Sequence, residues 1–437
     1  EFGMTGGWGN LPWHLLDGVK RSLGPHGWHS LRLLRATRLV NRHWSAWATA
    51  ATTYLEPSPG VVKNDARMAE MVVAFPAVRG LRYRFRQKIT EKDLLQMAMW
   101  TSLTELDIAG CCHGECLTEG LQALSRVTSL GKLGLGHCCR VTSGGLEALG
   151  NLGALTWLDM GACWEITNKR LGGLTCLSAL TWLELGCLVK SRNRVDSVGF
   201  SALEGLTNLQ HLSFQGACLM DAGLVHLAGL SRLRSLCLVG TCVAGWGLGQ
   251  LDGLGQLTAL DLSQSAVGDR GLAFLTAFRS LAQIELEGTL VSGEGFRHLG
   301  TLTSLKKVGL RGCRPVGPAG LKHLAQTSGI TDLDLGACRR VTDEGARVLA
   351  ALTGLRRLDL GGTRLTDGGL GALSSLSSLR HVSVRGCGVT PGGVGALRAA
   401  LPGLEVAGLT FRLYPRVRRL VTRCFGAVDG GDALGRA

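Results

Sequence analysis

Cysteine and histidine residues gather at two places in the N-terminal half of the chain, where their chemistry would suit a metal ion. The first group is Cys111, Cys112, His113 and Cys116, and the second is His137, Cys138 and Cys139. Thiolates and imidazoles at such spacings are typical zinc ligands. Cys111 and Cys138 also fall on a small-residue position that recurs along the chain. We therefore expect both to pack inside the protein, and we predict no metal site.

Residues for catalysis are not grouped in the way that known enzyme motifs require. The sequence has no GxxxxGK[ST] phosphate loop, no HExxH and no GxSxG. Its acidic residues recur as a regular column, whereas catalysis needs groups that converge on one reacting atom. We expect a protein that is not an enzyme and that uses no cofactor.

A repeated unit of 24 or 25 residues must position all of these side chains. Positions one, four and six of each copy are apolar, as in Ile330, Leu333 and Leu335, which is the alternation of a short strand. A threonine such as Thr342 then opens a stretch with the leucine spacing of a helix. One strand and one helix cannot bury their apolar faces alone, so the copies must stack into a solenoid.

The copy at Ile330, ITDLDLGACRRVTDEGA, resembles the cysteine-containing leucine-rich repeat, whose pattern is LxxLxLxxCxxVTDxGLxxL. The resemblance covers residues 78–403 in about thirteen repeats. It implies an α/β horseshoe with parallel strands on the concave face and helices on the convex face. The ninth position holds Cys111, Cys138, Cys163, Cys313, Cys338 and Cys387, and threonine or serine in other copies. We predict that these side chains form an internal ladder that satisfies buried backbone groups.

Residues 10–48 resemble an F-box, whose pattern begins LPxxLLxxI and ends near V-C-R-x-W. Asn41 takes the place of the usual cysteine, and about five extra residues follow Pro25. The resemblance implies a small all-α module that docks on a Skp-type adaptor and, through it, on a cullin. The adaptor-binding residues it implies are Leu11, Pro12, Leu15, Leu16, Val40 and Trp44. The alternative is that these helices only cap the first open edge of the solenoid.

The Pro-Ser-Pro-Gly stretch at residues 57–60 is the clearest domain boundary in the chain. We predict an F-box-like helical module over residues 1–55 and a linker over 56–77. The leucine-rich repeat solenoid would follow over residues 78–403, and a C-terminal cap with a basic tail over 404–437.

Positions three, five and seven of each repeat are expected to point off the concave face. Trp157 and Trp182 share position three in adjacent repeats, beside Asp159 and Glu184 at position five. Exposed tryptophans beside carboxylates are typical of protein-binding hot spots. The predicted target-binding residues are Trp157, Asp159, Trp182, Glu184, Asp107, Asp261, Glu285, Asp334 and Asp359. The alternative is that the acids belong to the repeat pattern and the tryptophans cover a neighbour.

The net charge of +14 is spread unevenly along the chain. Residues 101–403 carry 27 Lys and Arg against 23 Asp and Glu, a balance of only +4. A nucleic-acid binder should show a basic stripe on its working face, so we expect no nucleic-acid partner. No apolar run is long enough to span a bilayer.

Cysteine usage indicates a reducing environment. The chain has 15 cysteines, an odd number, with no signal peptide and no Asn-x-Ser/Thr sequon. We expect an intracellular protein of the cytoplasm or nucleus, with cytoskeletal association left open. The sequence opens with Glu-Phe-Gly rather than methionine, so a targeting signal ahead of it is also left open.

The F-box resemblance and the repeats together imply the substrate-recognition subunit of a cullin-based ubiquitin ligase, with the target protein held on the concave face. The alternative is a non-catalytic interaction scaffold or regulator, such as a cytoskeletal one.

Overall fold

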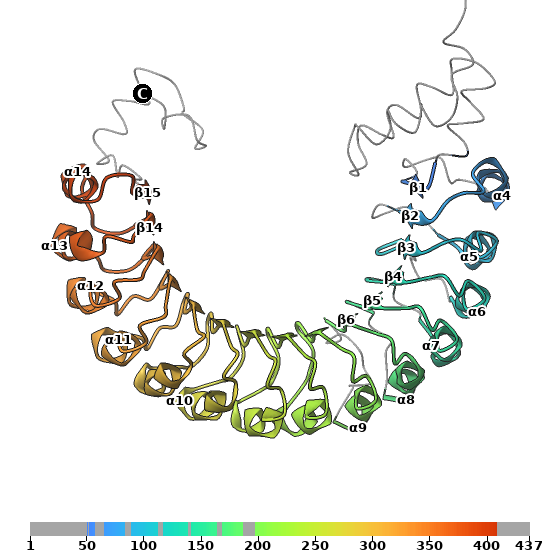
Figure 1. The fold of residues 1–437 in the computed structure, drawn as a ribbon, viewed down its shortest axis with the longest axis horizontal. Helices are drawn as coiled ribbons and strands as arrows, with labels where there is room; N and C mark the ends of the chain where they lie inside the picture. Colours follow the sequence, from blue (N-terminus) through green and yellow to red (C-terminus); the bar gives the residue numbers. More distant parts are fainter. Residues whose placement is uncertain are drawn as a thin grey trace, which may run out of the picture.

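A single curved sheet organises the protein. The computed structural model describes residue 50 and residues 52–56, 65–83, 89–111, 117–138, 141–163, 168–186 and 197–408. In this part of the chain 15 parallel strands stack in sequence order, from β1 to β15. The strands line the inner, concave face of a horseshoe and the helices form its outer face (Figure 1). The predicted leucine-rich repeat solenoid is confirmed.

Every strand is short, and most are three residues long. The strands are β1 (Tyr54–Leu55), β2 (Gly80–Arg82), β3 (Glu105–Asp107), β4 (Lys132–Gly134), β5 (Trp157–Asp159), β6 (Trp182–Glu184), β7 (His211–Ser213), β8 (Ser235–Cys237), β9 (Ala259–Asp261), β10 (Gln283–Glu285), β11 (Lys307–Gly309), β12 (Asp332–Asp334), β13 (Arg357–Asp359), β14 (His381–Ser383) and β15 (Glu405–Ala407).

The outer face is α-helical toward both ends and largely 3-10 helical in the middle. The α-helices are α4 (Asp65–Ala74), α5 (Glu91–Met97), α6 (Thr118–Leu124), α7 (Ser143–Leu149), α8 (Asn168–Leu171), α9 (Ser197–Phe200), α10 (Asp269–Leu272), α11 (Pro318–Leu324), α12 (Asp343–Leu349), α13 (Asp367–Ala372) and α14 (Pro391–Ala400). The 3-10 helices are η2 (Gly172–Cys176), η4 (Ser201–Leu203), η5 (Asp221–Leu227), η6 (Trp246–Leu251), η7 (Ala273–Ala277), η8 (Glu294–Thr301) and η9 (Leu373–Ser375).

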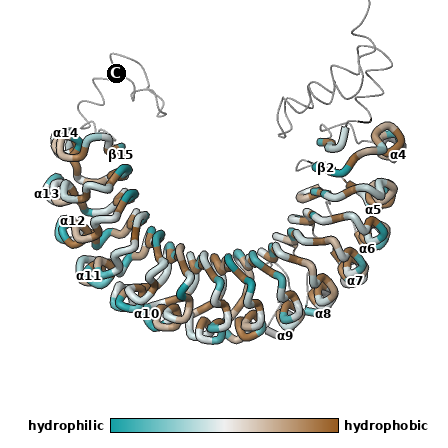
Figure 2. The backbone as a smooth tube through the Cα atoms, in the orientation of Figure 1, coloured by the Kyte–Doolittle hydropathy of each residue, from teal (hydrophilic) through white to brown (hydrophobic). Residues whose placement is uncertain are grey.

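The register of the sheet aligns equivalent positions of neighbouring repeats. In β5 and β6, for example, Leu158 pairs with Leu183, while the flanking residues of the two strands pair with one another. The central leucines are fully buried in the core between the sheet and the helices, whereas the flanking side chains are half-buried or exposed. Apolar residues accordingly alternate with polar ones along each strand (Figure 2). Positions three and five therefore face the concave side, as the sequence predicted.

Ninth-position side chains form the predicted ladder. The buried thiol of Cys338 donates to the carbonyl of Leu310 in the preceding repeat, with 3.0 Å between sulfur and oxygen. Thr363 instead donates from its hydroxyl to the carbonyl of Leu360 in its own repeat, at 2.7 Å. Cys338 thus links two repeats, whereas Thr363 closes a turn within one, and Cys111 likewise donates to Ala109 in its own repeat. Other cysteines that donate to the preceding repeat are Cys138, Cys163, Cys313 and Cys387.

The ladder thiols are expected to be chemically inert in the folded protein. Burial raises the pKa of Cys338 to about 12, so the unreactive thiol form persists at neutral pH. Exposed Cys176 and Cys242 should react with a thiol reagent within minutes, while Cys313 and Cys338 react only after unfolding. Labelling followed by peptide mass spectrometry measures this, with urea-unfolded protein as the control. Equal labelling rates for Cys338 and Cys242 would contradict the ladder.

Threonines at the helix starts play two different roles. Thr142 accepts from the amide of Gly145 and caps α7, as the sequence predicted. Thr366 precedes α13 without capping it; its hydroxyl and amide both donate to Asp343, in the helix of the preceding repeat. Thr366 therefore ties two repeats together.

The solenoid is longer at both ends than the predicted range of 78–403. Tyr54 and Leu55 form β1 in parallel with β2, and α4 lies within the stretch expected to be a linker. Trp100 donates from its indole nitrogen to the carbonyl of Phe75 at 2.9 Å, which ties this stretch to the next repeat. At the other end β15 pairs with β14. These end repeats depart from the leucine pattern of the others, which is why the sequence alone did not reveal them.

The F-box-like stretch and its residues Leu11, Pro12, Leu15, Leu16, Val40 and Trp44 lie outside the described residues, as does the tail after residue 408. Of the helices that the structure describes, none has the length and apolar character to cross a lipid bilayer.

Candidate functional site

An aromatic row lies on the concave face of β5, β6 and β7. Trp157, Trp182 and His211 occupy the same position in three adjacent strands. The rings of Trp182 and His211 stack with centroids 3.4 Å apart and planes 14° apart, and Trp182 is still 38% exposed. Burial lowers the pKa of His211, which favours the neutral imidazole. The structure places the two predicted tryptophans side by side and adds His211, which its position in the next repeat could have revealed.

Each position-five aspartate uses one carboxylate oxygen to hold its own backbone. Asp159 accepts from the amide of Gly161, and Asp334 from that of Gly336, both at 2.7 Å. The same contact, to the amide two residues on, is made by Asp107, Asp261 and Asp359. This local turn explains why an acid suits position five in many repeats. The second oxygen is left for other partners.

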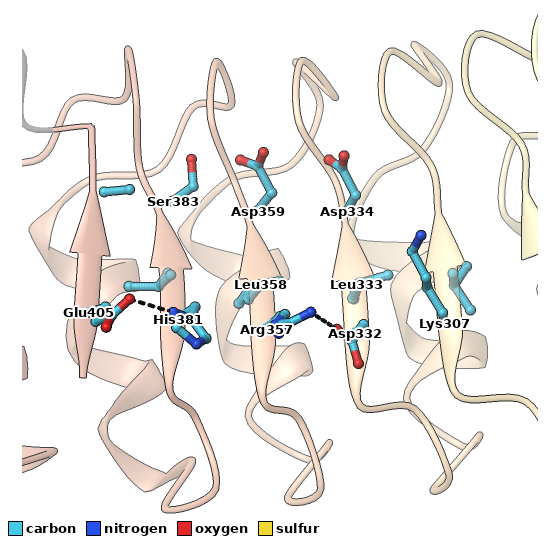
Figure 3. Close-up of a pocket in the computed structure, with 13 residues that line it drawn as sticks. Lys307, Asp332, Leu333, Asp334, Arg357, Leu358, Asp359, His381, Ser383 and Glu405 are labelled. Atoms are coloured by element: carbon cyan, nitrogen blue, oxygen red, sulfur yellow. Dashed lines mark ion pairs between the residues drawn. The ribbon is translucent and has the colours of Figure 1, made fainter. Parts of the chain in front are cut away.

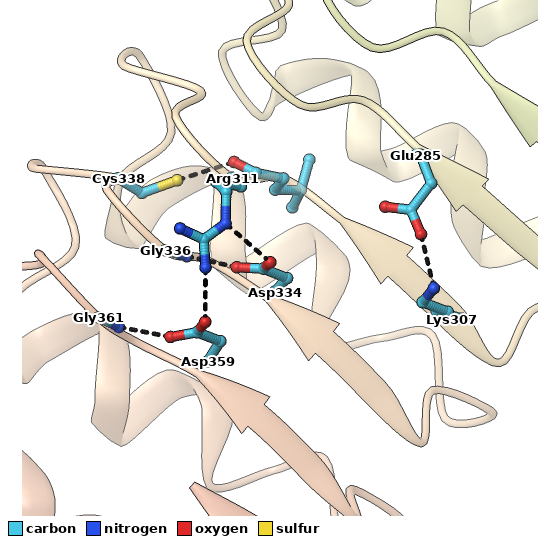
Figure 4. A network of polar contacts seen from close by, with 9 residues as sticks. Glu285, Lys307, Arg311, Asp334, Gly336, Cys338, Asp359 and Gly361 are labelled. Atoms are coloured by element: carbon cyan, nitrogen blue, oxygen red, sulfur yellow. Dashed lines mark hydrogen bonds and ion pairs between the residues drawn. The ribbon is translucent and has the colours of Figure 1, made fainter. Parts of the chain in front are cut away.

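In the C-terminal half of the sheet, acidic side chains at position five form ion pairs with arginine or lysine side chains of the same protein. Arg311 donates from Nε to Asp334 at 3.2 Å and from Nη2 to Asp359 at 2.7 Å, and so bridges two adjacent strands (Figure 4). The carboxylate of Asp334 is the main reason that the pKa of Arg311 is raised. Lys307 pairs with Glu285 at 2.9 Å in the same region. At the N-terminal end of the sheet, Arg82 pairs with Asp107 at 3.0 Å.

A groove of about 310 Å³ runs over β11 to β15 (Figure 3). Its position-three side chains also pair with one another. Arg357 lies 3.6 Å from Asp332, and His381 lies 2.8 Å from Glu405. The carboxylates that line this groove therefore already have arginine or histidine partners within the protein.

Asp159 and Glu184 differ from these acids. They pair in register on β5 and β6, yet in the described part of the chain no ion pair joins either carboxylate to a cation. Burial raises the pKa of both groups, and the charge of Asp159 raises that of Glu184 further. Two half-buried negative charges thus lie together beside the tryptophans. Asp159 is hydrogen-bonded to Gly161, and Glu184 to Ser213 and Gly186, but neither forms an ion pair with a described residue.

Asp159→Asn should leave the free energy of unfolding at pH 7 unchanged or slightly higher. The amide oxygen keeps the bond to Gly161, while the charge that burial disfavours is removed. Because the folded-state pKa of Asp159 is raised, the protonated carboxyl group stabilises the folded wild type at low pH. That contribution is lost as the pH rises through the folded-state pKa. The advantage of the variant should therefore vanish below the unfolded pKa of about 4. Urea unfolding at pH 7 and at about pH 3, which lies below the unfolded pKa, measures this difference. A clear loss of stability at pH 7 would contradict the prediction.

The cysteines and histidine whose spacing resembles that of zinc ligands are only partly described. Cys111 and Cys138 are buried and donate to backbone carbonyls, whereas Cys112, His113, Cys116 and Cys139 lie outside the described residues. Among the side chains that the structure describes, no group of three His, Cys, Asp or Glu residues is placed to hold a metal ion.

Comparison with known proteins agrees with this architecture. A family model described as "Leucine Rich repeat" matches residues 352–374. No curated protein matches the sequence. Among solved structures, an internalin (InlF) from Listeria monocytogenes is similar with 17% identity and a TM-score of 0.54, over 79% of this chain and 89% of that one.

Two further structures share the fold. A leucine-rich repeat protein of Leptospira interrogans has 14% identity and a TM-score of 0.52, over 81% of this chain and 88% of that one. The protein chain of a TLR13–ssRNA13 complex has 17% identity and a TM-score of 0.50, over 77% of this chain and 55% of that one. Leucine-rich repeat proteins bind protein partners and are typically non-catalytic. The repeats, the continuous parallel sheet and these likenesses together show that the chain has the leucine-rich repeat fold.

Proposed function

We propose that this protein is the substrate-recognition subunit of an SCF-type, cullin-based ubiquitin ligase of the cytoplasm or nucleus. The observation that carries the proposal is the F-box-like pattern of residues 10–48 directly ahead of a leucine-rich repeat solenoid. In this arrangement the N-terminal residues Leu11, Pro12, Leu15, Leu16, Val40 and Trp44 would bind a Skp-type adaptor. The concave face would hold the target protein.

The chain would then act by proximity. A rigid sheet holds a target at a fixed distance from the ligase, and the other subunits deliver ubiquitin to a lysine of that target. Holding two reactants together makes a bimolecular step effectively unimolecular, so the receptor needs no catalytic group of its own. The exposed tryptophan pair and the carboxylates beside it support a target site on the concave face.

A scaffold without a role in ubiquitin transfer is the second candidate, and the continuity of the sheet favours it. From β1 at Tyr54 onward the described strands form one continuous parallel sheet, which could bind a partner whether or not an adaptor is bound. In that case the N-terminal helices would only cap the solenoid.

Leu15→Asp should abolish capture of a Skp-type adaptor by the full chain. A charge in the apolar ridge of an F-box would leave a buried carboxylate without a partner, which costs several kcal/mol. A pull-down with purified adaptor and cullin measures the capture, and circular dichroism checks that the solenoid stays folded. Trp157→Ala is the matched control, because it changes the concave face and should keep full capture. Failure of the wild type to capture the adaptor would favour the scaffold.

A further inference from the structure

Two stretches of the concave face share one framework but differ in the charged side chains that surround their acids. The first runs over β4, β5 and β6, and the second over β11, β12 and β13. In each, a strand that ends in glycine precedes two strands that end in an acid. The matching positions are Lys132 and Lys307, Gly134 and Gly309, Asp159 and Asp334, and Glu184 and Asp359.

In the second stretch the chain fills the space between the two acids with its own arginine. Arg311, two residues after β11, reaches Asp334 on the next strand and Asp359 on the one after (Figure 4). The equivalent residue of the first stretch, two residues after β4, is Gly136. A Cβ atom at Gly136 would lie 2.7 Å from Oδ2 of Asp159. A side chain at this position would therefore start beside the carboxylate, but glycine supplies none.

The neighbouring position-three residues differ as well. Asp332 and Arg357 form an ion pair across β12 and β13, whereas Trp157 and Trp182 occupy the same places on β5 and β6. In the part of the chain that the structure describes, the first stretch thus has two acids that form no ion pair, with His137 near Asp159, and two tryptophans on the same strands. The remaining adjacent pair of acids, Asp261 and Glu285, already has Lys307 on Glu285.

We propose that Asp159 and Glu184 receive an arginine side chain from a basic segment of a bound protein, placed between them as Arg311 is placed between Asp334 and Asp359, with Trp157 and Trp182 against it. A guanidinium is planar and has five N–H donors, so it can bond two carboxylates at once, as Arg311 does. Its faces also stack on indole rings, which an ammonium group does less well. The partner is therefore a protein segment that presents an exposed arginine.

Burial is the main reason that the pKa values of Asp159 and Glu184 are raised, and the charge of Asp159 raises that of Glu184 further. A bound cation would favour the charged form of both carboxylates, which agrees with this geometry. The inference rests on the concave-face part of the proposed function only. It is independent of adaptor capture, so Leu15→Asp should leave it unaffected.

Fluorescence polarisation with labelled hexa-arginine, hexa-lysine and hexa-citrulline peptides tests the proposal on the full chain. The wild type should bind hexa-arginine at least tenfold more tightly than hexa-citrulline, and more tightly than hexa-lysine. Asp159→Asn with Glu184→Gln should weaken hexa-arginine binding at least tenfold. The matched control, Asp334→Asn with Asp359→Asn, removes two acids from the same repeat positions and should change it less than twofold. Equal losses in the two double variants, or equal binding of arginine and lysine peptides, would overturn the proposal.

Gly136→Arg supplies a second, independent measurement. The new side chain should bridge Asp159 and Glu184 within the protein, raise the urea midpoint of unfolding and block hexa-arginine. Undiminished peptide binding by a folded Gly136→Arg variant would contradict the assigned position. If this variant does not fold, the acid variants decide the question. Adaptor capture measured in parallel separates a failure here from a failure of the proposed ligase role.

Discussion

Gly293→Ala is expected to destabilise the solenoid by about 3 kcal/mol or more, a large fraction of a typical domain's stability. Gly293 precedes η8 with φ of +112°, in a region that side-chain-bearing residues rarely adopt. A Cβ atom there would also lie 2.5 Å from the Cα of Gly320 in the next repeat. Backbone lies on both sides of this contact, so no side-chain movement can relieve it, and the two repeats would have to separate.

Urea unfolding followed by circular dichroism measures this effect. Gly300→Ala is the matched control, because Gly300 lies in the same η8 helix and its added methyl group would meet nothing closer than Thr327 Oγ1 at 4.0 Å. The control should be neutral or slightly stabilising. If both variants unfold at the same urea concentration as the wild type, close packing between repeats at Gly293 does not limit stability.

The double variant Trp157→Ala, Trp182→Ala is expected to weaken target binding by about 2–4 kcal/mol, or roughly 30- to 1000-fold. The two rings lie side by side on a rigid sheet, and Trp182 keeps 38% of its surface exposed although His211 stacks on it. A partner can therefore bury both rings without rearranging the sheet. The fold should be retained, because the buried leucines of these two strands belong to the core and are unchanged.

Calorimetry with a partner identified by affinity purification and mass spectrometry measures this loss. Trp246→Ala is the control: Trp246 is 59% exposed but belongs to η6, away from the concave face. Unchanged affinity in the double variant would remove the tryptophan pair from the binding site. A similar loss with Trp246→Ala would indicate that the partner binds another surface of the horseshoe.

The sequence by itself determined the repeat, its strand and helix, and the side chains that face inward. These features are local, because each is set by residue spacing within one repeat. The ladder of Cys338 and its equivalents could be predicted for the same reason, since every copy places a small polar side chain at one turn. The sequence also placed Trp157 and Trp182 together, because equal positions in adjacent repeats must lie on adjacent strands.

Only the tertiary structure decided which of the acids form ion pairs with arginine or lysine side chains of the protein. Nine residues were predicted to bind a target, and the sequence treats the acids among them alike. Arg311 bridges Asp334 and Asp359 although 48 residues separate it from the second of these, and Asp159 meets no such arginine because Gly136 holds the equivalent place. The extent of the solenoid was also missed, at Tyr54 and Ala407, because these end repeats lack the full leucine pattern and are recognised only by the pairing of their strands. An ion pair between repeats forms only where a side chain is long enough to cross strands that lie about 4.8 Å apart. The spacing of residues within one repeat does not show which side chains meet in this way.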